Sequence, residues 1–199
     1  MTELVKNLEK KGYKVSVHNT KAEAAVYMEK QITNATVGIG GSMTAEEMGL
    51  YEKLSRNNTV YWHWKTTPGM TRPEILTAAA NAEVYISSVN GISEKGEIIN
   101  IDGSGNRVAS TIYGHKKVYL VIGKNKIAPD FESAMYRARN IAAPLNARRL
   151  NMPTPCGAKG DRCYDCASPA RICRAFSVFT DKPNGCEYEV VLINEDAGY

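Results

Sequence analysis

The apolar positions of the chain alternate between helical and extended spacing from one end to the other. Residues 4–8 place apolar side chains on one face of a predicted helix, and residues 13–18 have an extended pattern. Helical spacing returns over residues 20–32, and residues 35–39 form a short apolar strand. This alternation is typical of an α/β domain with a largely parallel sheet.

The alternation continues to about residue 150. Thr44 and Glu47 have the spacing of a capping box, so a helix is predicted from Thr44 to Arg56. Short runs rich in β-branched and aromatic residues suit a sheet covered on both faces, and they predict strands over 59–62, 84–88, 97–101 and 117–122. Further helices are predicted over 74–80, directly beyond Gly105, and over 130–150 with a bend or break at Pro144.

After residue 150 the character of the sequence changes. Residues 151–174 contain three prolines, two glycines and four of the five cysteines, with too few apolar residues to form a core. Residues 175–180 and 187–193 are predicted to form a β-hairpin. We therefore expect one α/β domain over residues 1–199, with a mostly parallel sheet flanked by helices, a cysteine-rich insert and a C-terminal hairpin.

Composition and charge exclude several classes of partner. The formal net charge is +4, from 25 basic and 21 acidic residues, and no Lys/Arg block is long enough to follow a phosphate backbone, so no nucleic acid is expected. No apolar run reaches the roughly 18 residues of a membrane span. The first residues lack a signal-peptide pattern, which predicts a cytoplasmic protein whose thiols are kept reduced.

Four of the five cysteines lie close together in the sequence, at Cys156, Cys163, Cys166 and Cys173. The two-residue gap lets neighbouring thiolates share one inorganic centre, and the outer pair completes a four-sulfur set. A [4Fe–4S] cluster is favoured over zinc, because zinc ribbons usually have two Cys-x2-Cys pairs. Zinc stays open, as do a redox-active Cys163/Cys166 dithiol and four inert thiols, whereas Cys186 is interpreted as a spare thiol. Basic neighbours that would offset the thiolate charge are Lys159, Arg162, Arg171 and Arg174.

A glycine-rich turn joins the predicted strand at 35–39 to the helix that follows it. Its glycines allow a close approach of the backbone, and free amides at a helix start attract a phosphate or carboxylate. The turn matches neither a P-loop nor a Gly-x-Gly-x-x-Gly nucleotide site, and an ordinary tight turn is the alternative. The predicted anion-binding residues here are Gly38, Gly40, Gly41, Ser42 and Thr44.

A second turn-rich segment covers residues 90–107, for which a plain hairpin is the alternative interpretation. Ligands of open α/β sheets bind at the carboxyl ends of strands, so both glycine turns are expected to face one crevice. Lys126 follows the strand at 117–122 and is predicted to hold a phosphate or carboxylate as a point charge. The other predicted ligand-binding residues are Asn90, Asp102, Gly103, Gly105, Asn106 and Arg107.

Several of these motifs together resemble the lactate-utilisation (LUD) domain family. They are residues 91–96, 100–108, 123–127 and 142–147, and the cysteine segment from Thr154 to Arg174, which resembles that of the cysteine-bearing stand-alone members. The resemblance extends from about Thr20 to Ile193. It implies a fold related to ribose-5-phosphate isomerase, glucosamine-phosphate deaminase and the coenzyme A transferases.

The resemblance also implies a role in metabolism. Some members of the family take part in oxidising lactate to pyruvate within a multi-protein system. This implies a small anionic metabolite as the ligand, either a hydroxy acid or a phosphorylated compound. It also implies lactate-system proteins or a second copy of the chain as partners.

Two other functions stay open. One is a sugar-phosphate isomerase or coenzyme A transferase with a structural zinc, in which Glu94 or Glu97 supplies a nucleophilic carboxylate. Asn90 counts against the isomerase, because it stands where related isomerases have an acidic residue and an amide cannot transfer protons. The other is a non-enzymatic ligand- or redox-sensing partner subunit. The catalytic candidates are Glu94, Glu97 and Lys126, and the sequence leaves open whether the protein is an enzyme.

Overall fold

The computed structural model describes all 199 residues, and a six-stranded sheet runs through its centre. Every neighbouring pair of strands in this sheet is parallel, which confirms the expected α/β class. The strands lie in the order β1 (Lys14–His18), β10 (Glu187–Ile193), β7 (Lys117–Gly123), β4 (Val84–Ser87), β2 (Thr36–Ile39) and β3 (Thr59–Trp62).

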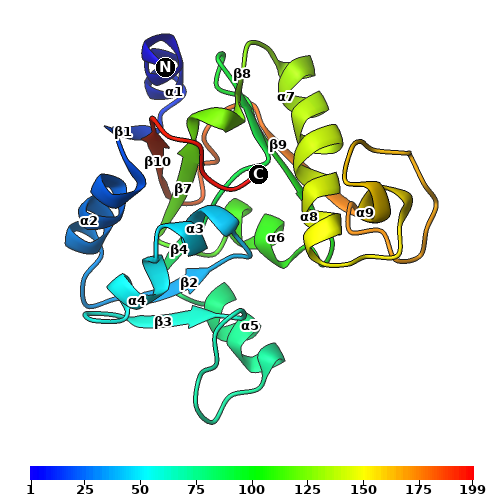
Figure 1. The fold of residues 1–199 in the computed structure, drawn as a ribbon. Helices are drawn as coiled ribbons and strands as arrows, with labels where there is room; N and C mark the ends of the chain where they lie inside the picture. The colour runs from blue at the N-terminus through cyan, green and yellow to red at the C-terminus, as the bar shows by residue number, and fades with distance from the viewer.

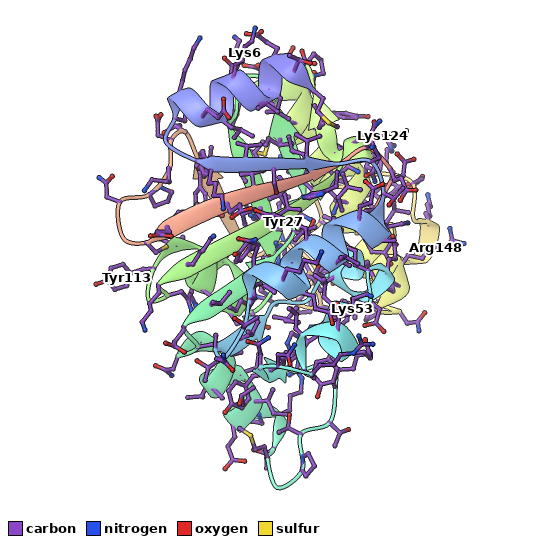
Figure 2. The ribbon with its side chains drawn as sticks, turned by 90° about the vertical axis from the view of Figure 1, so that its left-hand side faces the viewer. Lys6, Tyr27, Lys53, Tyr113, Lys124 and Arg148 are labelled. Carbon is purple, nitrogen blue, oxygen red and sulfur yellow. The ribbon has the colours of Figure 1, made fainter.

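Apolar side chains cover both faces of the central sheet. Along β7, Tyr119 and Val121 belong to one buried cluster, whereas Leu120 and Ile122 belong to a second one. This division follows from the two-residue period of a strand, whose successive side chains point to opposite faces. Helices around the sheet are α1 (Thr2–Lys10), α2 (Lys21–Gln31), α4 (Leu50–Leu54), α5 (Arg72–Ala80) and α6 (Asn106–Ile112). Figure 1 shows their arrangement, and in Figure 2 Tyr27 of α2 lies over the sheet.

A smaller four-stranded sheet contains β8 (Ile127–Ala128), β5 (Gly91–Ser93), β6 (Ile98–Asp102) and β9 (Ala175–Phe179), in that order. The predicted C-terminal hairpin is wrong, because β9 pairs with β6 in this sheet while β10 pairs with β1 and β7 in the central one. The physical reason is burial. Residues 188–193 are all buried, as in an interior parallel strand, whereas β9 alternates between buried and more exposed positions.

The predicted helix from Thr44 to Arg56 is also corrected. It is two short helices, α3 (Met43–Glu47) and α4, with Gly49 at φ 63° between them. The residue that caps α3 is Ser42, whose Oγ accepts a hydrogen bond from the Ala45 amide at 3.1 Å. The predicted capping residue, Thr44, is fully buried inside the helix, and its hydroxyl is used in tertiary contacts instead.

The segment 130–150 is helical, with an interruption near the predicted place. It consists of α7 (Phe131–Arg137), a π-helical turn over Ala138–Ala142, and α8 (Ala143–Arg149), which has Pro144 near its start. A π turn before a proline accommodates the missing amide hydrogen, and such turns are frequent at functional sites. The insert that follows contains one short helix, α9 (Pro155–Lys159), and no strand. None of the helices is long and apolar enough to cross a membrane.

Candidate functional site

A crevice of about 230 Å³ opens between the central sheet, the turn after β6 and helix α8. It lies where β2, β4 and β6 end, which is the expected place for a ligand in an open parallel sheet. Both glycine-rich turns contribute to its walls. The predicted residues that line it are Gly41, Ser42, Asn90, Asp102, Gly103, Asn106, Arg107 and Lys126.

The other predicted glycines do not line the crevice but let its walls approach one another. A Cβ on Gly38 would lie 2.3 Å from the Ala79 carbonyl oxygen, so only glycine allows α5 to pack against β2 there. A Cβ on Gly40 would lie 3.0 Å from the Arg107 side chain. Gly105 has φ 85° at the start of α6, a conformation that favours glycine.

Arg107 is anchored in the crevice wall by neutral oxygens. Its guanidinium donates to the carbonyl oxygens of Ser88 at 3.1 Å and Ile101 at 2.8 Å, and to the side-chain oxygens of Asn90 and Asn100. Burial lowers the pKa of Arg107, and the nearby Asp102 opposes this shift. Because Asn90 Oδ1 accepts a hydrogen bond from Arg107, it holds this guanidinium in place.

Asp102 lines the crevice, but its carboxylate accepts hydrogen bonds from backbone amides. Its Oδ2 accepts from the amides of Arg107 at 3.0 Å and Val108 at 3.1 Å, at the first turn of α6. Such a contact satisfies amides that have no partner within the helix. Asp102 therefore organises the turn and does not form an ion pair with the cations of the crevice.

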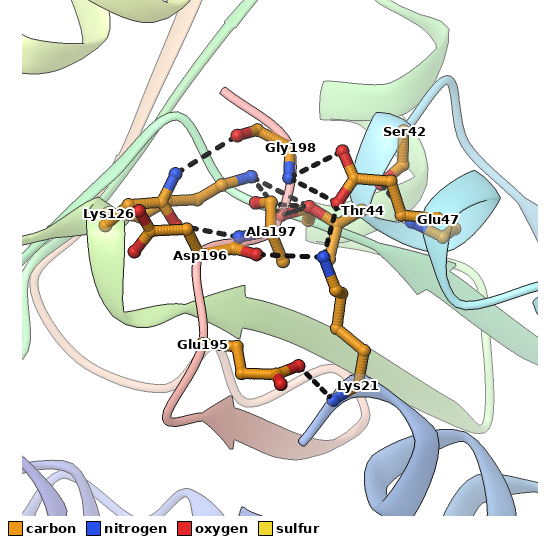
Figure 3. A network of polar contacts seen from close by, with 12 residues as sticks. Lys21, Ser42, Thr44, Glu47, Lys126, Glu195, Asp196, Ala197 and Gly198 are labelled. Atoms are coloured by element: carbon orange, nitrogen blue, oxygen red, sulfur yellow. Dashed lines mark hydrogen bonds and ion pairs between the residues drawn. The ribbon is translucent and has the colours of Figure 1, made fainter. Parts of the chain in front are cut away.

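Lys126 stands at the floor of the crevice with only 3% of its surface exposed. Its Nζ donates to Thr44 Oγ1 at 3.0 Å (Figure 3) and to Ser88 Oγ at 2.8 Å. It forms no ion pair. Burial, together with the charges of Arg137 and Arg107, lowers the pKa of Lys126 to about 7.

The last residues of the chain pack beside Lys126. The Ala197 carbonyl accepts from Thr44 Oγ1 at 3.0 Å, and the Gly198 amide donates to the Glu47 carboxylate at 3.2 Å (Figure 3). A Cβ on Gly198 would lie 3.3 Å from Lys126 Nζ.

Arg137 is buried like Lys126, whereas Arg107 is half-buried, and Arg137 lies behind the crevice wall. Its Nε donates to the Asn125 carbonyl and its Nη1 to the Asn90 carbonyl, each at 2.6 Å. None of the three cations has a carboxylate within ion-pair distance. Buried charges are normally paired, so this arrangement leaves a positive potential that a bound anion would neutralise.

The four predicted cysteine ligands line one cavity between α8 and the insert. Polar hydrogens reach several of the sulfur atoms. The Asp165 amide and Arg171 Nε donate, each at 3.3 Å, to the Sγ atoms of Cys163 and Cys173. The fifth cysteine, Cys186, lies elsewhere, beside the apolar cluster that contains Leu8.

The four thiols line one cavity but do not converge on a single point. No group of three or more His, Cys, Asp or Glu side chains converges closely enough to hold one metal ion, so the expected tight four-sulfur shell is not formed. Sulfurs around one zinc, each about 2.3 Å from it, would lie about 3.8 Å from one another. In a [4Fe–4S] cluster each thiolate binds a different iron, so its sulfurs stand further apart. The cavity that the four cysteines help to line has a volume of about 20 Å³, so the insert would have to widen around a cluster.

The crevice and the cysteine cavity are adjacent. Ala143 and Ile172 line both of them. The end of the insert also packs on the turn after β6, where the Arg174 amide donates to the Asp102 carbonyl at 2.9 Å. A ligand in the crevice and an inorganic centre among the thiols would therefore be separated by a wall about one side chain thick.

Sequence reasoning missed the mouth of the crevice. Trp64 stacks on Trp62 with 5.2 Å between ring centroids, and the Arg149 guanidinium lies 4.7 Å from the Trp64 ring. The remaining missed residues there are His63, Arg72, Leu150 and Tyr199. They come from four separate places in the chain, 63–64, 72, 149–150 and 199, so only the fold brings them together.

The weak catalytic candidates Glu94 and Glu97 do not line the crevice. Both lie at the turn between β5 and β6, where the Glu94 side chain is exposed and Glu97 Oε2 accepts from Ser93 Oγ. The crevice therefore offers neither of them a role as a nucleophile. Lys126 is the one catalytic candidate that faces it.

Comparisons with known proteins agree with the geometry of the fold. The family model for the LUD domain matches residues 1–193. A crystal structure of a DUF162 family protein from Deinococcus radiodurans has 13% sequence identity over 97% of this chain and 95% of that chain, with a TM-score of 0.57, which indicates the same fold. A crystal structure of eIF2B beta from Chaetomium thermophilum covers 57% of this chain and 44% of that chain at 14% identity, but its TM-score of 0.38 is too low to indicate a shared fold. None of the curated proteins matches the chain.

Proposed function

Because the chain belongs to the LUD domain family, we propose that it is a lactate-utilisation protein that binds a 2-hydroxy acid beside a cysteine-bound [4Fe–4S] cluster. The observation that carries this proposal is a set of two buried cations and one half-buried cation that have no carboxylate within ion-pair distance. Lys126, Arg107 and Arg137 have only neutral oxygens as partners, and a carboxylate in the crevice would supply the missing charge.

A small carboxylate suits the crevice better than a long anion. Lys126 can meet the carboxylate from the floor, because two hydroxyls hold its Nζ in place. Arg107 lies in the adjoining wall and adds positive charge. The polar side chains of Ser42 and Asn106 also line the crevice, where they can bind a hydroxyl group of the ligand.

The residues that would hold the cluster are Cys156, Cys163, Cys166 and Cys173. A [4Fe–4S] cluster supplies transfer of one electron at a time. Arg171 and the Asp165 amide offset the negative charge of the thiolates by donating to their sulfurs. Arg139, on the π-helical turn, adds a further positive charge, since the Cys163 sulfur and Asp165 raise its pKa.

Lactate oxidation to pyruvate releases two electrons and two protons, so one cluster cannot accept both electrons. We infer that a partner in the same system, either another subunit or a second copy of this chain, accepts the remainder. The short wall formed by Ala143 and Ile172 would let the cluster take part in that transfer.

Anoxic purification tests the cluster. The wild-type protein is expected to be brown, with about four irons and four sulfides per chain. The Cys163→Ser variant should lose the iron and the colour, whereas Cys186→Ser should keep both and serves as the matched control. A colourless protein with stoichiometric zinc would reject electron transfer and favour a structural metal.

Anoxic addition of lactate to the brown protein tests the ligand. Lactate bound next to the cluster should lower its visible absorption when the partner acceptor is present. No change with lactate or related hydroxy acids, together with recovery of stable protein partners, would instead favour a non-enzymatic partner subunit.

A further inference from the structure

Lys126 has the surroundings of a nucleophilic amine. Its side chain is buried at the floor of the crevice, and no carboxylate holds it as an ammonium ion. Lysines become neutral, and therefore nucleophilic, when they are desolvated beside other cations. Arg107 and Arg137 supply those cations here.

We propose that Lys126 forms an imine with the carbonyl carbon of a 2-oxo acid bound in the crevice. This inference rests on the proposed function, because the 2-oxo acid is the product of 2-hydroxy acid oxidation. It assigns the amine a covalent role in addition to its role as an anion anchor. The ligand class is a 2-oxo acid small enough for the crevice, such as pyruvate.

The hydrogen bonds around Nζ leave its lone pair available. The Thr44 hydroxyl donates to the Ala197 carbonyl at 3.0 Å, so its oxygen accepts a hydrogen from Nζ. Ser88 Oγ, 2.8 Å from Nζ, can accept a hydrogen from the amine or donate one to it. Two hydroxyls therefore orient the amine without charging it. The pKa of about 7 is consistent with a neutral fraction near neutral pH.

The neighbouring cations would position the carbonyl group. Arg107 lies in the crevice wall close to Lys126, where its charge attracts the ligand carboxylate. Because the carboxylate and carbonyl carbons of a 2-oxo acid are directly bonded, anchoring one brings the other next to Nζ. The same charge polarises the carbonyl oxygen and favours attack at its carbon.

The reaction is balanced without an oxidant or a further reactant. The Nζ lone pair forms a bond to the carbonyl carbon, and the π electrons of the C=O bond move to oxygen. That oxygen takes a proton from the attacking nitrogen, with Ser88 Oγ close enough to relay it. The carbinolamine then loses its oxygen as water, so one amine and one 2-oxo acid give one imine and one water.

Borohydride trapping tests the imine. Pyruvate is incubated with the full-length protein, sodium borohydride reduces any imine to a stable secondary amine, and intact mass and peptide mapping locate the product. We expect a single adduct on Lys126 in the wild-type protein. The matched control is Lys124→Arg, which removes an exposed lysine of the same turn and should leave the adduct unchanged.

Lys126→Arg separates covalent chemistry from anion binding. It keeps the positive charge but cannot form an imine, so it should show no adduct while pyruvate still raises its melting temperature. If Lys126→Arg does not fold, as judged by circular dichroism, Lys126→Met tests the position of the adduct alone and should give none. Folded wild-type protein that gives no adduct, or an adduct spread over surface lysines, would overturn the proposal.

The two proposals fail in different ways. An iron-free protein that still traps pyruvate on Lys126 would remove the cluster but keep the imine. A protein with about four irons that traps no pyruvate would keep the cluster and remove the imine. Exchange of the pyruvate carbonyl oxygen with labelled water gives a second readout, since each cycle of imine formation and hydrolysis replaces that oxygen.

Discussion

Two groups of buried charges lie at opposite ends of the central sheet, and only one of them is neutralised. Near the beginnings of β1, β7 and β10, the fully buried Glu189 accepts from Lys117 at 2.8 Å and from Tyr27 at 2.6 Å, and Lys14 lies 3.1 Å away. At the carboxyl ends of the strands, Lys126 and its neighbouring arginines have no carboxylate partner.

The pKa shifts at the two ends have different directions. Burial alone would raise the pKa of Glu189, but its bonds to Lys117 and Tyr27 outweigh burial and lower it. The pKa values of Lys14 and Lys117 are raised, whereas those of Lys126, Arg107 and Arg137 are lowered, chiefly by burial. The charge group around Glu189 is thus neutralised within the fold, whereas the group around Lys126 has room for an anion from outside. This difference distinguishes a structural charge cluster from a binding site in the same sheet.

The largest expected effect on stability comes from breaking the neutralised charge group around Glu189. Glu189→Gln removes the negative charge and leaves the half-buried Lys117 unpaired, so we expect the free energy of unfolding to fall by about 3–5 kcal/mol. Urea denaturation at pH 7 measures this as a lower midpoint with an unchanged m-value.

Glu52→Gln is the matched control for this variant. It breaks an exposed pair with Lys65 and should cost less than about 1 kcal/mol. The stabilisation from Glu189 is fully present above its unfolded pKa of 4.5 and is lost as the pH falls below that value. The wild-type and Glu189→Gln proteins should therefore converge in stability in acid. A loss as small as that of Glu52→Gln would contradict the assignment of a structural cluster.

The next effect concerns the charge group around Lys126, which has no carboxylate partner and which a bound anion should neutralise. Pyruvate at about 100 times its dissociation constant is expected to stabilise the wild-type protein by about 2.7 kcal/mol. Glu189→Gln should keep this gain, because the two clusters lie at opposite ends of the sheet and distant sites are additive. Thermal denaturation with and without pyruvate measures this stabilisation in the wild-type and Glu189→Gln proteins. An equal stabilisation of Lys126→Met by pyruvate would argue against the crevice as the binding site.

The smallest expected effect is the removal of the unpaired charge itself. Lys126→Met keeps most of the side-chain volume and removes a buried amine, but it also leaves the Thr44 and Ser88 hydroxyls without a donor. We expect the free energy of unfolding to rise by about 2 kcal/mol at pH 7. This is the cost of burying the amine, given by its pKa shift, minus the cost of the two unpaired hydroxyls.

The pH dependence of the Lys126→Met effect has a definite sign. The pKa of Lys126 is about 7 in the folded protein and 10.5 in the unfolded chain, because burial, and then Arg137 and Arg107, lower the folded value while Glu47 opposes them. Between these values the unfolded chain binds the extra proton, so wild-type stability rises with pH across that window. The slope should be smaller in Lys126→Met, as urea titrations from pH 6 to 10 would show. A variant that is less stable than the wild type at pH 6 would disprove an unpaired buried amine.

Much of the fold could be predicted because its signals are local. The strands at 36–39, 59–62 and 117–123 and the first two helices lie close to their predicted places. The C-terminal hairpin failed, because a short spacing between two strands does not reveal that they join different sheets. The prediction of Thr44 as the capping residue was wrong because Ser42, two residues earlier, caps the helix. The burial of Thr44 is not visible in the sequence.

The site was predicted in part. The glycine turns, Arg107 and Lys126 were found because glycines and cations after a strand end are a recognisable pattern. The mouth of the crevice, with Trp64 and Arg149, was missed. Its residues come from different elements, and no spacing rule connects them.

The sequence by itself determined the parallel α/β architecture, the two glycine-rich turns and the grouping of four cysteines. Each depends on residues that are close together in the chain. Only the tertiary structure decided which charges stay unpaired, because that depends on partners far apart in sequence. Lys126 meets Thr44 across 82 positions, and Arg137 meets Asn90 across 47. Neutral oxygens reach those cations because the folded sheet brings the segments together, and that packing leaves the crevice positive.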